Sequence, residues 1–201
     1  MARKSEIYIR IAQKAVQLGN EIEHVKGRFP TFLVGLIGEY LAMAKLAGNG
    51  VKFYPKGGQA CYDLQLEQGT KIEVRTSLLK NEGVFFGKRR IFNYGWRLKD
   101  RGKDVEFDYV ICIALDRGNL EDSKFYILTK SEVQNAPSIE IGRFKKVEKR
   151  LWIYPSLETM NEAKEDKPQY VPKWEENINT NKDEYLLDNR WDLLTSIENV
   201  Q

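Results

Sequence analysis

Hydrophobic residues near the N-terminus recur at helical spacing in two stretches. Residues 5–23 carry Ile7, Ile11, Val16 and Leu18 after Ser5, which is a candidate N-cap. Residues 31–50, TFLVGLIGEYLAMAKLAGNG, are apolar almost all round, with Thr31 as a candidate cap and Gly-Asn-Gly as the stop signal. The pattern predicts two helices, and the second is expected to be largely buried, with Glu39 as its one acidic residue.

Short segments with the character of strands follow these helices. They read VKFYP, CYDLQLE, KIEVRTS, FDYVICIAL and KFYILT. The run DYVICIAL is apolar at consecutive positions, which predicts a central strand buried on both faces and covered by helices. TKSEVQNA favours a short helix, and KRLWIYP a last or edge strand. The chain is therefore expected to form an α/β or α+β domain.

Residues 62–77, YDLQLEQGTKIEVRTS, predict a tight hairpin in which Gly69 supplies the positive φ of the turn. If paired residue numbers sum to 136, Leu64 opposes Ile72 on an apolar face. On the other face, Asp63 opposes Glu73. A slip by one residue would bury charges and expose core side chains, so the apolar face fixes the register.

Two carboxylates held side by side repel each other, so a pair with a purely structural role would destabilise the fold. A divalent cation resolves this conflict: Mg²⁺ binds one or two carboxylates and leaves positions for water and substrate phosphate. It also lowers the pKa of a bound water, which favours phosphodiester hydrolysis at neutral pH. The alternative is that Glu73 pairs with Lys71 or Arg75, while Asp63 is a solvated strand residue.

These segments together resemble the PD-(D/E)XK nuclease superfamily. The resemblance runs through GEYLAMAKL, YDLQ and IEVRTS, where the family commonly reads IEVKTS, and it continues through FDYVICIALD and KFYILTKSEV. It covers about residues 31–135. It implies a restriction-endonuclease-like α/β fold with an αβββαβ core and a mixed central sheet flanked by helices, to which the hydrophobic spacing near the C-terminus adds a helical tail.

The resemblance also implies roles for particular residues. Asp63 and Glu73 would bind Mg²⁺, or Mn²⁺, with Glu39 as a direct or water-bridged ligand and the Val74 carbonyl as a further one. Arg75 departs from the family, because it stands where the family has lysine. A guanidinium stays protonated and cannot act as a base, but it can stabilise negative charge in the transition state. The family's lysine could instead be replaced by Lys71 or Lys80.

Charge divides the chain into a basic body and an acidic tail. Residues 1–155 hold 27 Lys and Arg against 18 Asp and Glu, whereas residues 156–201 hold 5 against 11. We therefore expect a nuclease-like domain over 1–155 and an acidic extension over 156–201. The extension ends in apolar residues at helical spacing, which predict an amphipathic helix that docks on the body or on a second subunit: Leu186, Leu187, Trp191, Leu194 and Ile197.

Cations cluster in residues 80–104, where aromatic residues are interleaved with them. Positive side chains would contact DNA phosphates. The aromatic residues could stack on bases, but packing under the sheet is the favoured interpretation for Phe85, Phe86, Phe92, Tyr94 and Trp96. The expected DNA contacts are Lys56, Lys80, Lys88, Arg89, Arg90, Arg97, Lys99 and Arg101.

The composition bounds the location and the classes of site. No run approaches the roughly 20 apolar residues of a membrane span, and the N-terminus lacks the apolar region of a signal peptide, so we expect a cytoplasmic protein with no membrane partner. Cys61 and Cys112 lie in strand-like runs, which favours a core role over a disulfide. A single histidine, His24, does not make a zinc site with them.

The sequence therefore predicts a Mg²⁺-dependent DNA endonuclease of restriction or homing type. Its partner would be double-stranded DNA, and cutting two strands would call for a homodimer. Two alternatives stay open. One is an inactive DNA-binding or regulatory module on a nuclease fold, which Arg75 suggests. The other is a structure-selective repair or recombination nuclease, such as a junction resolvase.

Overall fold

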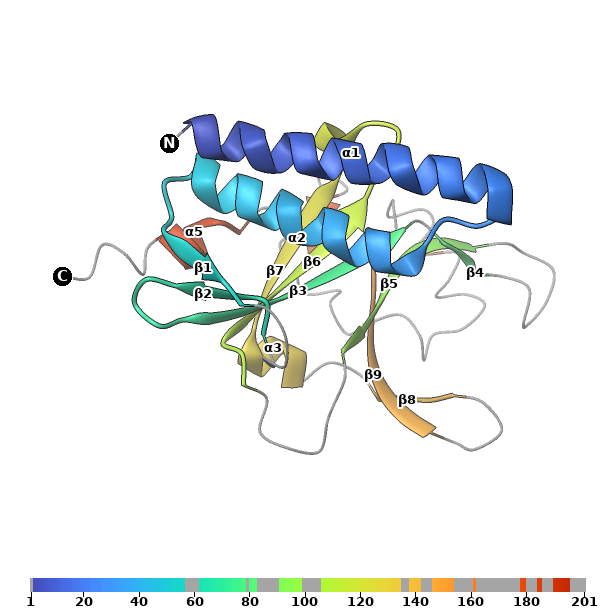
Figure 1. Cartoon of the computed structure of the whole chain (residues 1–201). Coiled ribbons are helices and arrows are strands. Elements are labelled where there is room, and N and C mark those ends of the chain that lie inside the picture. The colour runs from blue at the N-terminus through green and yellow to red at the C-terminus, as the bar shows by residue number, and fades with distance from the viewer. Residues whose placement is uncertain are drawn as a thin grey trace.

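The computed structural model describes residues 2–56, 62–78, 80–82, 91–98, 106–134, 138–141, 146–153, 161, 178–179, 184–185 and 190–195. Two antiparallel helices, α1 (Ala2–Lys26) and α2 (Thr31–Gly48), lie along one face of a sheet (Figure 1). Tyr8 stacks beside Tyr40 with ring centroids 6.2 Å apart. An ideal Cβ on Gly19 would lie 2.1 Å from the Phe29 ring, so the loop between the helices packs closely on α1 at this end.

Both helices are confirmed, but both predicted N-caps are wrong. Helix α1 begins at Ala2, and the Ser5 hydroxyl donates a hydrogen bond to the Ala44 carbonyl (2.9 Å) instead of capping its own helix. Helix α2 is preceded by Pro30 in extended conformation, which makes Thr31 the first helical residue. The stop signal is confirmed, because Asn49 caps the C-terminus and Gly50 has a φ of 79°.

The main sheet has five strands in the order β1-β2-β3-β6-β7. They are β1 (Phe53–Pro55), β2 (Leu64–Leu66), β3 (Lys71–Leu78), β6 (Tyr109–Leu115) and β7 (Lys124–Thr129). Strands β3 and β6 are parallel and the other neighbours are antiparallel. Residues 110–115 of β6 are buried as expected, and β6 has a neighbour on each side, although β3 is the central strand. The predicted α/β class with a mixed sheet flanked by helices is confirmed.

A second sheet, with the strand order β4-β5-β9-β8, lies beyond the first. Its strands are β4 (Lys80–Glu82), β5 (Ile91–Leu98), β8 (Ser138–Ile141) and β9 (Lys146–Ile153), so the crossover from β3 to β6 carries β4 and β5. The short elements are η1 (Leu120–Asp122), α3 (Lys130–Gln134), β10 (Ile178–Asn179), β11 (Glu184–Tyr185) and α5 (Asp192–Thr195). The predicted short helix after β7 is thus confirmed.

The five-stranded sheet is buried on both faces. One face packs on the helices through residues such as Leu33, Ile37 and Ile111. The other face holds a smaller core around Cys112 and Tyr126, and the buried Trp96 meets Tyr126 edge-on at 5.9 Å. The inward packing predicted for the aromatic residues is therefore confirmed for Trp96. Cys112 is a free, buried thiol, and burial raises its pKa well above the ordinary value.

The end of the tail docks on the body. Leu194 is fully buried in the larger core, and Trp191 packs on Phe125 with ring centroids 5.5 Å apart. Arg190 donates to Glu132 (2.8 Å) and to the Ile127 carbonyl (3.3 Å). Docking of this segment is therefore as expected. The helix is short, however: α5 covers Asp192–Thr195, and residues 184–185 form a strand with β10.

Helix α2 is long and apolar enough, by length and composition, to cross a membrane. The sequence expectation counted uninterrupted apolar runs, and Glu39 and Lys45 interrupt this one. Of this segment, 56% is buried inside the structure. A helix in the core of a globular protein can have the same length and apolar composition.

Candidate active site

The hairpin between β2 and β3 has the predicted register. Leu64 pairs with Ile72 and Gln65 with Lys71. Gly69 has a φ of 95°, and the Leu66 N–H donates to the Thr70 carbonyl at 2.8 Å to close the turn. Burial of Leu64 and Ile72 on the helix-covered face explains why the register is fixed.

Asp63 lies just before β2, and it leaves the ladder there. Its N–H donates to the carbonyl of Ile72 (3.0 Å), the residue that Leu64 already opposes, so two residues face one as at a β-bulge. Its Oδ2 accepts the N–H of Val74 at 2.7 Å. The prediction that Asp63 and Glu73 are direct cross-strand neighbours is therefore wrong, because the Asp63 side chain takes a hydrogen bond that a continued strand would have made.

Glu39 reaches the same place from α2. Its neighbour Gly38 sits directly on Thr76 of β3: an ideal Cβ on Gly38 would lie only 1.7 Å from Thr76 Oγ1. Burial raises the pKa of Glu39, and the negative charge of Asp63 raises it further. Two carboxylates from a helix and from a strand end thus influence each other in a partly buried site.

The pKa of Asp63 is also above its ordinary value. Burial is the main cause, and the Val74 N–H and the positive charge of Arg75 oppose it in part. The effect of burial is therefore the larger one: a hydrogen bond and a nearby cation do not fully compensate the cost of burying the negative charge. The site therefore favours neutralisation of the Asp63 carboxylate, by a proton or by a cation.

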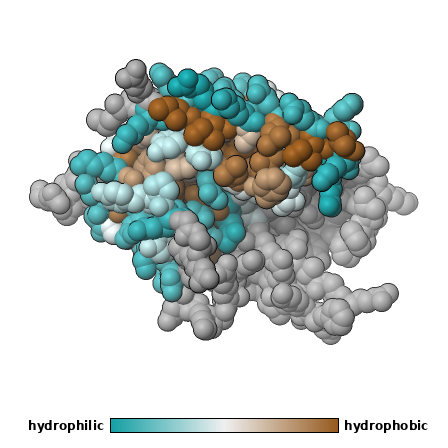
Figure 2. All heavy atoms as spheres, in the orientation of Figure 1, coloured by the Kyte–Doolittle hydropathy of each residue, from teal (hydrophilic) through white to brown (hydrophobic). Residues whose placement is uncertain are grey.

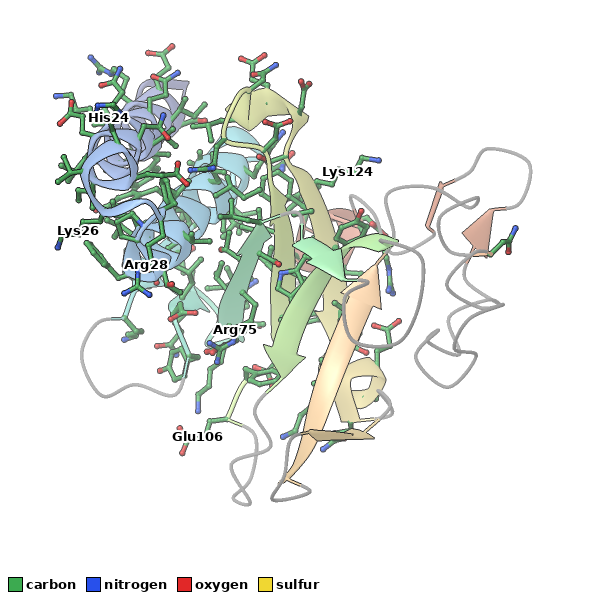
Figure 3. The ribbon with its side chains drawn as sticks, turned by 90° about the vertical axis from the view of Figure 1, so that its right-hand side faces the viewer. His24, Lys26, Arg28, Arg75, Glu106 and Lys124 are labelled. Carbon is green, nitrogen blue, oxygen red and sulfur yellow. The ribbon has the colours of Figure 1, made fainter. Side chains whose placement is uncertain are left out.

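Glu73 and Arg75 follow each other on the face of β3 turned away from the helices. Glu73 is buried, with 7% exposed, and forms an ion pair with the Arg75 guanidinium. The Arg75 side chain remains 33% exposed. In Figure 3, Arg75 lies low on the sheet, away from α1 and α2. The pairing of Glu73 with Arg75 is the alternative that the sequence left open, and it engages Glu73 with a cation on its own strand.

The described residues contain no group of three or more His, Cys, Asp or Glu side chains that could hold a metal ion. The predicted set of Glu39, Asp63 and Glu73 is therefore not assembled around one point in this structure. Glu39 and Asp63 are electrostatically coupled, and two carboxylates fit Mg²⁺, which fills its other positions with water and phosphate oxygens. The Val74 carbonyl stays a predicted ligand.

Two predicted cations lie near this site. The Lys56 N–H donates to the Asp63 carbonyl (2.8 Å), which continues the β1–β2 register and sets Lys56 opposite Asp63 with an exposed side chain. The Lys71 Nζ lies 5.2 Å from the centre of the Tyr62 ring, and its backbone N–H is held by Asp108 at 2.8 Å. Lys56 is thus accessible, whereas Lys71 is directed at an aromatic ring.

The remaining predicted DNA contacts lie further along the chain. Lys80 and Arg97 lie on β4 and β5, where Arg97 is opposite Arg150 of β9. The others, Lys88, Arg89, Arg90, Lys99 and Arg101, lie outside the described residues.

Sequence reasoning missed the contact that positions Glu39. Gly38 and Thr76 are ordinary residues in GEYLAMAKL and IEVRTS, and neither carries chemistry. The signal was a glycine beside the acidic residue in the middle of a helix, where glycine is unfavourable and often marks a close packing contact.

No protein-family model matches the chain, and no curated protein matches it. Among solved structures, a bacterial homing endonuclease, I-Ssp6803I, aligns with 18% identity and a TM-score of 0.42, over 63% of this chain and 77% of that one. A similarity at this level does not assign a function.

Proposed function

We propose that the protein is a metal-dependent DNA endonuclease of the PD-(D/E)XK type. The observation that carries the proposal is the coupling of Glu39 and Asp63, two partly buried carboxylates whose pKa values are both raised. They come from the helix and the strand end that the sequence marked, and the positive charge of Arg75 is close enough to Asp63 to act on its pKa. A buried excess of negative charge with access to solvent suits a divalent cation.

Each residue has a role that follows from its surroundings. Glu39 and Asp63 would hold Mg²⁺, which when bound polarises the phosphodiester and lowers the pKa of a water. The Val74 N–H fixes the Asp63 carboxylate. Arg75, oriented by Glu73, would stabilise negative charge on the phosphate oxygens as phosphorus is attacked. The exposed ammonium of Lys56 would contact a phosphate of the DNA backbone.

Arg75 cannot accept a proton from the attacking water, because its guanidinium stays protonated. The lowered pKa of a metal-bound water would therefore take the place of a protein base. From the sequence alone, we further expect an enzyme of restriction or homing type that acts as a homodimer in the cytoplasm.

A second candidate is an inactive DNA-binding module on the same fold. The observation that favours it is the ion pair between Glu73 and Arg75, which engages an expected ligand with a cation from its own strand. In this case the protein would bind DNA in a salt-dependent manner without cutting it.

The experiment is an incubation of the purified chain with a random-sequence library of long duplex DNA, which contains sites for an enzyme of unknown specificity. The reaction is run with Mg²⁺, Mn²⁺ or EDTA, and in parallel with branched DNA. The variants are Glu39→Gln, Asp63→Asn and Arg75→Lys. Glu67→Gln is the matched control, since Glu67 is an exposed acid of the same hairpin that pairs with Lys52.

Metal-dependent fragments that disappear in Glu39→Gln and Asp63→Asn but persist in Glu67→Gln are expected. We expect losses on the order of 100-fold or more, as is usual when a group that stabilises the transition state is removed. DNA binding without cleavage in any metal, including with Arg75→Lys, would establish the binding module instead. Cleavage of branched DNA alone would identify a structure-selective nuclease.

A further inference from the structure

Within the part of the chain that the structure describes, α1 and α2 carry an apolar surface that the proposed function does not use. Large exposed hydrophobic side chains among the described residues are concentrated there: Ile7 (43% exposed), Leu18 (48%), Val25 (81%), Phe32 (70%) and Leu36 (37%). Figure 2 shows brown, apolar atoms running along both helices on the face turned to the viewer. We call these five residues the helical patch.

The exposed area of the helical patch can be compared with the apolar patches of monomers and with protein–protein interfaces. Its exposed fractions correspond to an area on the order of 500 Å², at the upper end of what monomers tolerate. A standard interface buries about 800 Å² per partner, of which a little more than half is apolar. The helical patch therefore matches the apolar part of one side of such an interface.

The order of residues along α1 is self-complementary about Leu18. Ile11 lies seven residues before Leu18 and Val25 seven residues after it, so the three share one side of the helix. Lys14 and Glu21, both exposed, lie between them on the same side. If a second α1 runs antiparallel with Leu18 opposite Leu18, then Ile11 faces Val25, and Lys14 lies within one residue of Glu21 of the other copy.

Helix α2 adds its own exposed apolar residues beside α1. Phe32 and Leu36 are four residues apart, so they share one side of α2. Tyr8 of α1 contacts Tyr40 of α2, and Phe29, just before α2, contacts Gly19 of α1. The first turn of α2 therefore lies alongside the middle of α1, and Phe32 and Leu36 widen the apolar surface near Leu18.

We propose that the helical patch is the interface of a symmetric dimer of this chain, with α1 packed antiparallel against α1 of a second copy about Leu18. A twofold interface must be complementary to itself, so that each residue pair occurs twice. The apolar pair of Ile11 with Val25 and the charged pair of Lys14 with Glu21 both satisfy this requirement.

Other occupants fit the helical patch less well. The apolar residues at the end of the tail are already used, because Trp191 packs on Phe125 and Leu194 is buried in the core. A lipid surface attracts helices whose polar face is rich in Lys and Arg, whereas here one cation, Lys14, and one acid, Glu21, lie between the apolar positions and balance each other.

The test measures the mass of the full chain in solution by sedimentation velocity, without DNA or metal, so that its outcome is independent of the nuclease proposal. The monomer mass is 23.4 kDa, and we expect twice this value at micromolar concentration. Leu18→Glu should weaken association on the order of 100-fold or more, because two charges would be buried against each other. Circular dichroism confirms that this exposed position leaves the fold intact.

A charge exchange tests the antiparallel arrangement specifically. Lys14→Glu alone and Glu21→Lys alone should each weaken the dimer, since each places like charges opposite one another twice. The double variant Lys14→Glu/Glu21→Lys should restore association. A monomeric wild-type chain overturns the proposal, as does a dimer that Leu18→Glu leaves unchanged or a double variant no better than the singles. Binding of a monomeric chain to anionic vesicles that is lost in Leu18→Glu would assign the patch to lipid instead.

Discussion

The contact between Gly38 and Thr76 makes a prediction about how Glu39 is held. An alanine at position 38 would place its Cβ 1.7 Å from Thr76 Oγ1, 2.8 Å from Thr76 Cβ and 3.0 Å from Thr76 Cγ2. Rotation of the threonine side chain relieves the first and third contacts but not the second, because Cβ is fixed to the backbone. Helix α2 must therefore move by about 1 Å before the two carbons reach the roughly 3.5–4.0 Å of ordinary packing.

The energy of this change is the balance of two effects. Overpacking in a well-packed region costs about 1–3 kcal/mol. Replacing a helical glycine by alanine stabilises the helix by about 1 kcal/mol. Gly35 lies on the same helix, and an added Cβ there meets nothing within 4 Å, so Gly35→Ala gains the second effect without the first. We therefore expect Gly38→Ala to be about 1–3 kcal/mol less stable than Gly35→Ala.

Thermal unfolding of the two variants measures this difference. For a chain of this size it corresponds to a gap in Tm of roughly 2–10 °C. Calorimetric titration with Mg²⁺ provides a second measurement, because a displaced α2 carries Glu39 away from Asp63. Binding should weaken in Gly38→Ala and stay as in wild type in Gly35→Ala. Equal Tm values for the two variants would refute the close contact, and weakened stability with unchanged Mg²⁺ binding would refute its role in positioning Glu39.

Two further predictions follow from buried charges and from the tail. Because the pKa of Glu39 is raised in the folded state, the metal-free protein loses stability as pH rises from about 4.3 through the raised value. In EDTA, Glu39→Gln should therefore be more stable than wild type at pH 7 and equally stable at pH 3. Urea unfolding at both pH values checks this, and a variant that is less stable than wild type at pH 7 would contradict it. Leu194→Ala should lower the free energy of unfolding by about 2–5 kcal/mol, whereas Asp192→Ala on the exposed side of the same short helix should change it by no more than about 0.5 kcal/mol. Equal effects of the two would mean that the tail does not hold the core.

Local sequence patterns predicted most of the elements. The apolar runs of α2 and β6 predicted buried elements because burial on all sides requires apolar residues at every position. The hairpin register also followed from the sequence, because Leu64 and Ile72 can both be buried only in one parity, and Gly69 permits the turn that this parity needs.

Predictions from the sequence failed for two single side chains, Ser5 and Asp63. Ser5 is a good N-cap by type, but its hydroxyl bonds to Ala44, which is 39 residues away in the sequence. Asp63 satisfies the alternation of a strand, but its carboxylate competes for the Val74 N–H and ends the ladder. Neither outcome can be predicted from neighbours along the chain.

The sequence by itself determined the succession of helices and strands and the parity of the hairpin. It also placed Asp63, Glu73 and Arg75 at the hairpin and Glu39 in the helix that precedes it. It did so because periodicity and burial act over short distances along the chain. Only the tertiary structure decided which acids act together. The approach of α2 to β3 through Gly38 couples Glu39 to Asp63, and the ion pair with Arg75 engages Glu73 on the opposite face. Packing distance between elements sets these pairings, and packing distance is not written in any local pattern.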